Sequence, residues 1–130
     1  MDIDIDLAAP EAVYEQIVRQ IEQGVQQGML LPGAPLPSIR QVADDLALNP
    51  NTVAKAYKLL ENQHVIVTAG RKGTFVSPDA AGQIDSRNRR EAAYLAGQLL
   101  RDLLDKGLSA TEIRAVFADV MTASLGAEGS

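Results

Sequence analysis

Two helix starts lie close together in the middle of this chain, and they restrict its fold more than any other feature. Ser38 and Gln41 form an S-x-x-Q capping box, in which each side chain accepts a hydrogen bond from the backbone N–H of the other residue. Asn49 is a preferred N-cap residue, and Pro50 suits the first position of a helix. The sequence therefore predicts a short helix, a tight turn and a second helix.

Regular patterns on both sides of these starts predict a larger unit. Pro10 is expected to open an earlier helix, because apolar residues recur at helical spacing over residues 13–25. Further on, β-forming residues at 65–68 and 74–77 flank a turn with two glycines at 69–73. We therefore expect three helices followed by a β-hairpin, in a mostly α fold with a small β part.

Two other segments are expected to be extended. Residues 2–7 alternate acidic and apolar side chains, which suits a short strand or an extended arm. Residues 30–37 contain three prolines and a glycine, which favours a stiff connector.

The C-terminal part of the chain is predicted to be a separate helical hairpin. Residues 79–86 have the composition of a linker, so we expect one domain at 1–78 and a C-terminal region at 87–125. The first helix of that region is expected to stop at Gly107, and an S-x-x-E capping box at Ser109 starts the second.

This hairpin carries more apolar surface than two helices bury on each other. A wide apolar face without a partner marks an interface, and a symmetric second copy is the expected cover. We therefore expect a homodimer, and we expect residues 127–130 to fray. The predicted dimerisation residues are Leu95, Leu99, Leu100, Leu103, Val116, Phe117 and Val120.

The residue inventory argues against an enzyme. The chain has no cysteine, a single histidine (His64), no G-x-S-x-G motif and no phosphate-binding loop. Neither a catalytic triad nor a metal site is expected from these residues, and no cofactor is expected; His64 reads as a partly exposed loop residue. Because no apolar run approaches about 18 residues and the start lacks a secretory signal, a cytoplasmic protein is expected.

The charge distribution identifies one segment suited to an anionic partner. The whole chain carries a net charge of −5, which opposes binding to nucleic acid. Residues 36–76, in contrast, hold five basic and three acidic side chains, a net charge of +2. A locally basic face on an acidic protein is still able to bind DNA.

The helix that starts at Asn49 carries side chains suited to reading bases. Asn51 and Thr52 stand in its first turn, the end that enters the major groove in helix-turn-helix docking. Asn pairs with adenine, Thr contacts a thymine methyl, and Lys55 reaches either guanine or phosphate. Lys58, one turn later, is either a backbone contact or free.

Three other basic side chains are candidates for phosphate contacts. Arg40 lies in the first turn of the preceding helix, on the same expected surface. Arg71 and Lys72 lie at the hairpin tip between two glycines, where they suit phosphate or minor-groove contacts. The alternative for all three is a solvated surface charge.

Part of the sequence resembles a known family. The run LPSIRQVADDLALNPNTVAKAYKLLENQHVI, followed by GRKGTFV, resembles the GntR family of bacterial transcription regulators, and its YtrA-type subfamily in particular. The likeness covers roughly residues 10–78 and combines the P-S-x-R start, the NPNTV turn and the glycine-containing wing. It implies a winged helix-turn-helix that binds a palindromic operator as a homodimer, usually as a repressor; the sequence identifies no small-molecule effector.

The resemblance also implies a set of DNA contacts. They fall at the start of the second helix, in the third helix and in the wing. Many relatives have a further basic pair entering the wing, where this chain has Thr68 and Ala69, which implies a weaker wing contact. The residues implied are Ser38, Arg40, Asn51, Thr52, Lys55, Arg71, Lys72, Gly73 and Thr74.

Two alternatives stay open at this point. The cluster of Arg87, Arg89 and Arg90 is either a solvated linker end or a contact to phosphate or to an acidic partner. The whole chain is either a DNA-binding regulator or a winged-helix module that binds another protein and has lost DNA binding.

Overall fold

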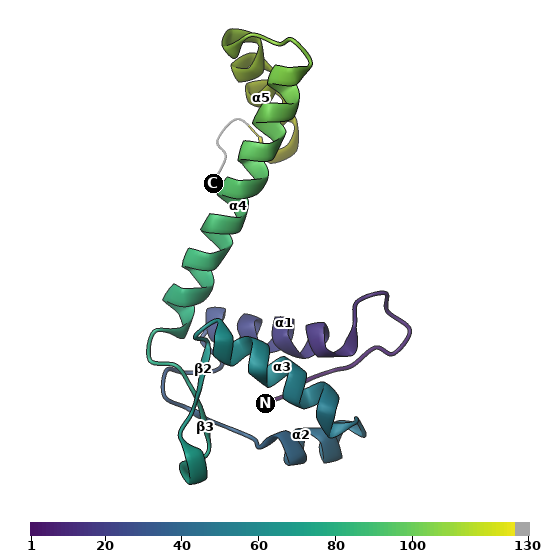
Figure 1. Ribbon diagram of the computed structural model, residues 1–130, viewed down its shortest axis with the longest axis vertical. Helices are drawn as coiled ribbons and strands as arrows, with labels where there is room; N and C mark the ends of the chain where they lie inside the picture. Colours follow the sequence, from purple (N-terminus) through teal and green to yellow (C-terminus); the bar gives the residue numbers. More distant parts are fainter. Residues whose placement is uncertain (127–130) are drawn as a thin grey trace. The chain divides into compact units, whose positions relative to one another are not determined.

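The chain divides into two units, Met1–Arg87 and Asn88–Ser130, and the computed structural model describes residues 1–126. The first unit holds three helices and a small sheet, and the second is helical (Figure 1). The predicted mostly α fold with a small β part is therefore confirmed. The expectation for residues 127–130 lies outside the described residues.

Three helices form the body of the first unit. They are α1 at Val13–Gln26, α2 at Ile39–Leu46 and α3 at Pro50–Asn62. The predicted capping box is present at the start of α2: the Ser38 hydroxyl accepts from the Gln41 N–H at 3.1 Å, and the Gln41 amide oxygen accepts from the Ser38 N–H at 3.0 Å.

A small antiparallel sheet completes the first unit. Its strands are β1 at Pro35–Leu36, β2 at Ile66–Thr68 and β3 at Thr74–Val76, in the order β1-β3-β2. β2 and β3 are the predicted hairpin, whereas β1 lies in the segment expected only as a connector. A strand of two residues shows no alternation in the sequence, and Pro35 is tolerated because β1 is an edge strand.

One apolar core joins the helices to the sheet. Complete burial of a Val, Leu or Ile side chain stabilises the folded state by about 1.5–3 kcal/mol. The core therefore fixes the positions of the elements that carry exposed polar residues. The residues at most 2% exposed include Ile17, Ile21, Val53, Leu60, Ile66 and Val76.

The segment expected to be a linker is helical. α4 runs over Ala80–Asp105, so residues 80–86 are the beginning of a helix and the predicted start at Arg87 is wrong. Ala80 and Ile84 are each 1% exposed and belong to the core of the first unit. This burial stabilises a helix start that a composition rich in small residues does not reveal.

Asp79 explains locally why α4 begins where it does. Its carbonyl accepts from the backbone N–H of Gln83 at 3.0 Å, and its carboxylate accepts from the Gln83 side-chain amide and the Ser77 hydroxyl, each at 2.8 Å. The bond from Gln83, followed by that from Ser77, holds the pKa of the Asp79 carboxyl below its usual value. Asp79 therefore stands directly before α4, with its carboxylate bound to the side chains of Ser77 and Gln83.

The second unit contains the rest of α4 and α5 at Ala110–Leu125. The predicted capping box is again present: the Ser109 hydroxyl accepts from the Glu112 N–H at 3.2 Å, and a Glu112 carboxylate oxygen accepts from the Ser109 N–H at 3.0 Å. This backbone hydrogen bond from Ser109 is the main reason that the pKa of Glu112 is lowered. Both predicted helices of the hairpin are therefore present.

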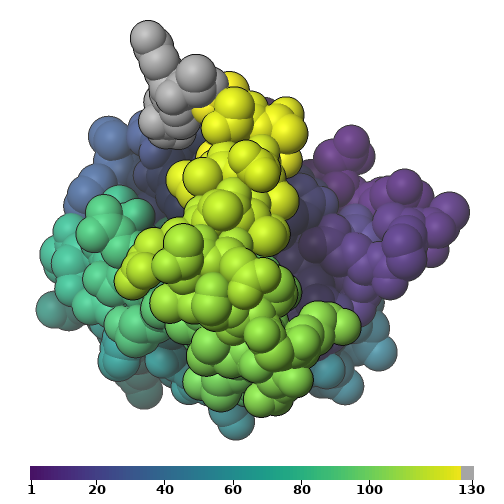
Figure 2. Space-filling view, turned by 90° about the horizontal axis from the view of Figure 1, so that it is seen from above, coloured from purple at the N-terminus to yellow at the C-terminus, as the bar shows by residue number. Residues whose placement is uncertain are grey.

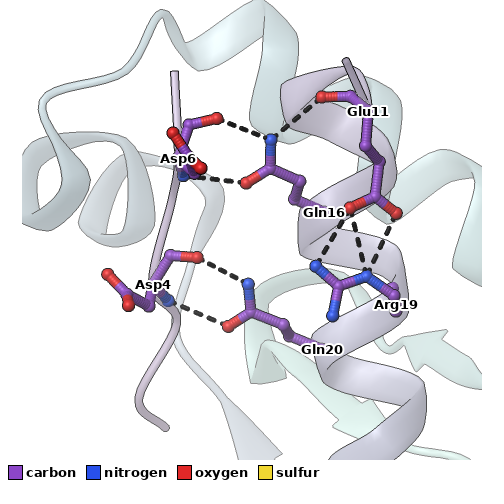
Figure 3. Close-up of polar contacts among 6 residues, drawn as sticks. All are labelled: Asp4, Asp6, Glu11, Gln16, Arg19 and Gln20. Carbon is purple, nitrogen blue, oxygen red and sulfur yellow. Dashed lines mark hydrogen bonds and ion pairs between the residues drawn. The ribbon is translucent and has the colours of Figure 1, made fainter. Parts of the chain in front are cut away.

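Two glutamines of α1 bind the backbone of the N-terminal arm (Figure 3). Their side-chain amides make the hydrogen bonds that a neighbouring strand would make in a sheet. Gln16 exchanges two hydrogen bonds of 2.9 Å with the backbone N–H and carbonyl of Asp6, and Gln20 does the same with Asp4 at 2.9 and 2.6 Å. Four helical residues rise about 6 Å and two extended residues span about 6.6 Å, so the two spacings match. Residues 2–6 are therefore an extended arm and not a strand.

The same contacts shift the start of α1. The helix begins at Val13 and not at Pro10, because the preceding residues form a turn. The Glu11 carbonyl accepts a further hydrogen bond of 2.9 Å from the Gln16 amide, and its carboxylate pairs with Arg19 through bonds of 3.0 and 3.1 Å (Figure 3).

Candidate nucleic-acid interface

The first turn of α3 presents short polar side chains. The Asn49 side-chain oxygen accepts from the Asn51 N–H at 2.8 Å, and Pro50 occupies the first helical position, as predicted. Asn51 is exposed and Thr52 is half-buried, and neither side chain has a hydrogen-bond partner within residues 1–126. Their polar groups are therefore available to a partner outside this chain.

A hydrogen bond connects the segment just before α2 to α3. The Tyr57 hydroxyl donates to the Pro37 carbonyl at 2.7 Å, and Tyr57 is only 5% exposed, so its ring belongs to the core. Burial raises the pKa of Tyr57 to about 12. Ser38 and the exposed Arg40 follow Pro37 directly, so this bond fixes where α2 starts relative to α3.

The turn between α2 and α3 needs a left-handed residue. Ala47 has a φ of 53°, and the next N–H, that of Leu48, donates to the Ala43 carbonyl at 2.9 Å. This hydrogen bond terminates α2 just after Leu46, its last residue. The chain then continues directly to Asn49, the N-cap of α3.

The hairpin tip is a tight basic turn. Gly70–Lys72 form a short 3-10 segment, and Gly73 has a φ of 108°, a value that favours glycine. Arg71, Lys72 and Gly73 are exposed, whereas Thr74 is half-buried in β3. In the part of the chain that the structure describes, Arg71 and Lys72 form no ion pair.

The fold brings these three groups to one side of the first unit. In Figure 1, α2, the N-terminal end of α3 and the tip of the β2–β3 hairpin all lie toward the lower end of that unit. The segments that carry the candidate residues, which come from distant parts of the sequence, thus lie toward the same side of the first unit.

Lys55 has an intramolecular partner that the sequence did not reveal. Its ammonium nitrogen lies 4.0 Å from the centre of the Tyr14 ring on α1. From the sequence, Tyr14 is one of the residues at helical spacing over 13–25, a pattern that predicts burial and no contact with Lys55. Lys58 is exposed on the same helix as Lys55.

Arg87 contacts an acidic residue of its own chain. Its guanidinium forms two hydrogen bonds with the Glu22 carboxylate, one of them 2.9 Å long, and also donates to the Gln63 side-chain oxygen. The side chains of Arg87 and Glu22 are only 19% and 12% exposed. Arg87 therefore connects the beginning of α4 to α1, while Arg89 and Arg90 are exposed on α4.

Residues 1–126 show neither a metal-binding cluster nor a membrane-spanning helix. No group of His, Cys, Asp or Glu in that range is arranged to hold a metal ion. Within the same range, no helix is both long enough and apolar enough to cross a membrane.

Comparison with known proteins identifies the family. A family model described as "Bacterial regulatory proteins, gntR family" matches residues 13–76. The HTH-type transcriptional repressor YtrA of Bacillus subtilis is 42% identical over 78 residues, which are 60% of this chain and 60% of that protein. A GntR-family transcription factor, YtrA from Sulfolobus acidocaldarius, has a solved structure that is 30% identical with a TM-score of 0.56, covering 94% of this chain and 98% of that one. The chain belongs to the GntR family.

A further solved structure is similar over most of the chain. A transcriptional regulator from Oenococcus oeni is 36% identical with a TM-score of 0.64, covering 90% of this GntR-family chain and 97% of that protein. The expected likeness to YtrA-type members is thus confirmed. The match to the curated Bacillus protein spans three fifths of that protein's length, and the family model spans α1 to β3, the elements that carry the candidate contacts.

Proposed function

We propose that this GntR-family chain is a sequence-specific DNA-binding transcription regulator of the cytoplasm. This proposal rests on the first turn of α3, which presents exposed Asn51 and half-buried Thr52 and lies on the same side of the first unit as α2, the helix of exposed Arg40, and the wing tip. Asn51 and Thr52 read base edges in the major groove. Arg40 and the wing residues Arg71 and Lys72 hold backbone phosphates and set the affinity.

Three smaller roles complete the proposed interface. The Ser38 hydroxyl accepts a hydrogen bond from Gln41, which leaves its proton to donate to a phosphate. Gly73 lets the wing backbone approach the DNA closely, and Thr74 supports it from β3. Lys58 adds a phosphate contact from α3, the recognition helix.

We further propose that the regulator is a homodimer formed by the second unit. Among the described residues of that unit, Ile113, at 4% exposed, is the one buried apolar side chain. Figure 2 shows one face of α5, in yellow-green to yellow, at the surface turned to the viewer. Leu103 and Phe117 are half-buried, and the more exposed members of the proposed interface are Leu95 at 66%, Leu99 at 47%, Leu100 at 42%, Val116 at 40% and Val120 at 54%.

Dimerisation compensates for the low charge of a single DNA-binding unit. The segment 36–76 carries only +2, which gives few phosphate contacts and a modest affinity. Two copies related by a two-fold axis place their recognition helices in successive major grooves, about 34–36 Å apart. The target is then a palindrome, and occupancy of a promoter palindrome gives repression, the activity in the name of the Bacillus relative.

Selection of bound sequences from random duplex DNA tests this proposal. The expected result is a palindromic consensus that is bound with an affinity that falls steeply as salt rises. Absence of salt-dependent binding to any duplex would contradict it and would favour the alternative, a winged-helix module that binds another protein.

A further inference from the structure

The contact between Tyr14 and Lys55 joins the first helix to the recognition helix. Tyr14 is half-buried and packs against the apolar core, while Lys55 is exposed with its ammonium nitrogen 4.0 Å from the ring centre. A cation over an aromatic face is attracted by the negative face of the ring. The ring therefore restrains a side chain that would otherwise sample many rotamers.

The surroundings of this pair are cationic. A shallow depression of about 260 Å³ is lined by Tyr14, Lys55, Lys58, Leu59 and Asn62. No carboxylate belongs to this lining, so neither ammonium group is neutralised there. A depression with two ammonium groups and no acidic side chain suits an anion such as a phosphate group.

The position of the Lys55 ammonium group favours one of the two partners expected from the sequence, guanine and phosphate. Asn51 and Thr52 belong to the first turn of α3, the end that approaches base edges. Lys55 stands a turn later, and its ammonium group is held against α1, so it is withheld from the base edges that the first turn meets.

We propose that Tyr14 is a positioning residue for DNA binding, which holds Lys55 on the α1 side of α3 so that its ammonium group meets a backbone phosphate and not a guanine edge. This inference rests on the proposed DNA-binding function. Lys55 then contributes affinity without sequence preference, and base reading is left to Asn51 and Thr52.

A measurement without DNA tests the geometry first. Reductive methylation with a ¹³C label gives each lysine a dimethylated ammonium group that keeps its charge, and Lys55→Arg assigns the Lys55 signal. The ring of Tyr14 should shift this signal upfield in the wild-type chain and in Tyr14→Phe, and the shift should vanish in Tyr14→Leu. An unshifted wild-type signal would overturn the proposal.

Binding to the selected palindrome and to a scrambled duplex tests the role. Tyr14→Leu should lower both affinities by the same factor, about two- to fivefold, and Tyr14→Phe should change them by less than about twofold. Lys55→Met should reduce the salt slope by about 0.9 per protomer. In the Lys55→Met background, Tyr14→Leu should cause no further loss.

Four outcomes of the binding measurements would also overturn the inference. They are an unchanged affinity in Tyr14→Leu, an equal loss from Tyr14→Leu when Lys55 is already Met, a loss in Tyr14→Phe as large as in Tyr14→Leu, and a loss in Lys55→Met confined to the selected palindrome. The last outcome would assign Lys55 to a base. If the wild-type chain binds no duplex, the proposed function fails, and this role fails with it even where the methyl signal is shifted.

Discussion

His64 closes α3 in a backbone conformation that suits glycine better than histidine. Its φ is 62°, its N–H donates to the Glu61 carbonyl at 3.0 Å, and the N–H of Val65 donates to the Leu60 carbonyl at 2.9 Å. This is the hydrogen-bond pattern of a Schellman motif. The only histidine of the sequence thus has a structural position at a helix end.

Replacement of His64 by glycine should therefore stabilise the protein. The left-handed conformation costs a non-glycine residue about 1–2 kcal/mol, and the greater freedom of glycine in the unfolded chain offsets about 0.4–1 kcal/mol of the gain. We expect His64→Gly to raise the free energy of unfolding by about 0.5–1 kcal/mol in urea denaturation. Asn62→Gly, at the last residue of α3, is the matched control and should lower it; a destabilised His64→Gly would contradict the account.

Tyr57 links the recognition helix to the start of α2 through a single hydroxyl. Tyr57→Phe removes the 2.7 Å bond to the Pro37 carbonyl and should cost about 1–2 kcal/mol of unfolding free energy at neutral pH. Tyr94→Phe, at a side chain 63% exposed, is the control and should have little effect.

The pH dependence of the stability difference between the wild-type chain and Tyr57→Phe is a second readout. Because the pKa of Tyr57 is raised from 10.0 to about 12, the folded state favours the protonated phenol. This contribution is complete below about pH 10 and is lost as the pH rises through about 12. The stability advantage of the wild-type chain over Tyr57→Phe should shrink over that range; an advantage that grows there would contradict the assignment.

At the scale of elements, the N-terminal arm depends on two glutamine side chains. Gln16 is 2% exposed and makes three hydrogen bonds to the backbone of Asp6 and Glu11. We expect Gln16→Leu to cost about 1–3 kcal/mol and to accelerate hydrogen exchange at the Asp6 amide. Gln23→Leu, at an exposed position of the same helix, should leave that exchange unchanged. Equal protection of Asp6 in both variants would show that the glutamine does not hold the arm.

Elements with local signals could be predicted from the sequence. The capping boxes at Ser38 and Ser109 and the cap at Asn49 place three helix starts correctly, because each signal lies within four residues. β1 and the start of α4 could not be found in this way. β1 exists through pairing with β3, and the start of α4 depends on burial of Ala80 and Ile84 in a core built by distant segments.

In the candidate interface, too, local features could be predicted from the sequence and contacts between distant residues could not. Exposure of Asn51, Arg40 and the wing tip follows from helix periodicity and turn position, both of which are local. The contact of Lys55 with Tyr14 and the ion pair of Arg87 with Glu22 join residues far apart in sequence. The alternatives of guanine or phosphate for Lys55, and of solvent or partner for Arg87, therefore could not be decided from the sequence.

At the scale of the whole molecule, the proposed function requires two copies of the chain. A carboxylate in the centre of the apolar face proposed for dimerisation is left buried without a partner, at a cost of several kcal/mol. We expect Leu99→Glu to weaken the dimer by about a hundredfold or more in sedimentation velocity at micromolar concentration. Leu7→Glu, at a residue 79% exposed in the first unit, is the control. A wild-type monomer, or a Leu99→Glu dimer of unchanged strength, would contradict the proposed interface.

In the proposed interface, one set of side chains reads the base sequence while another sets the affinity. The most direct measurement is the ratio of affinities for the selected palindrome and a scrambled duplex at fixed salt. Asn51→Ala should lower this ratio. The lost free energy of discrimination should be about 1–3 kcal/mol for each half-site. The double variant Arg71→Ala and Lys72→Ala should weaken both duplexes alike and keep the ratio. An Asn51→Ala protein with the wild-type ratio, or a wing variant that loses it, would contradict the account.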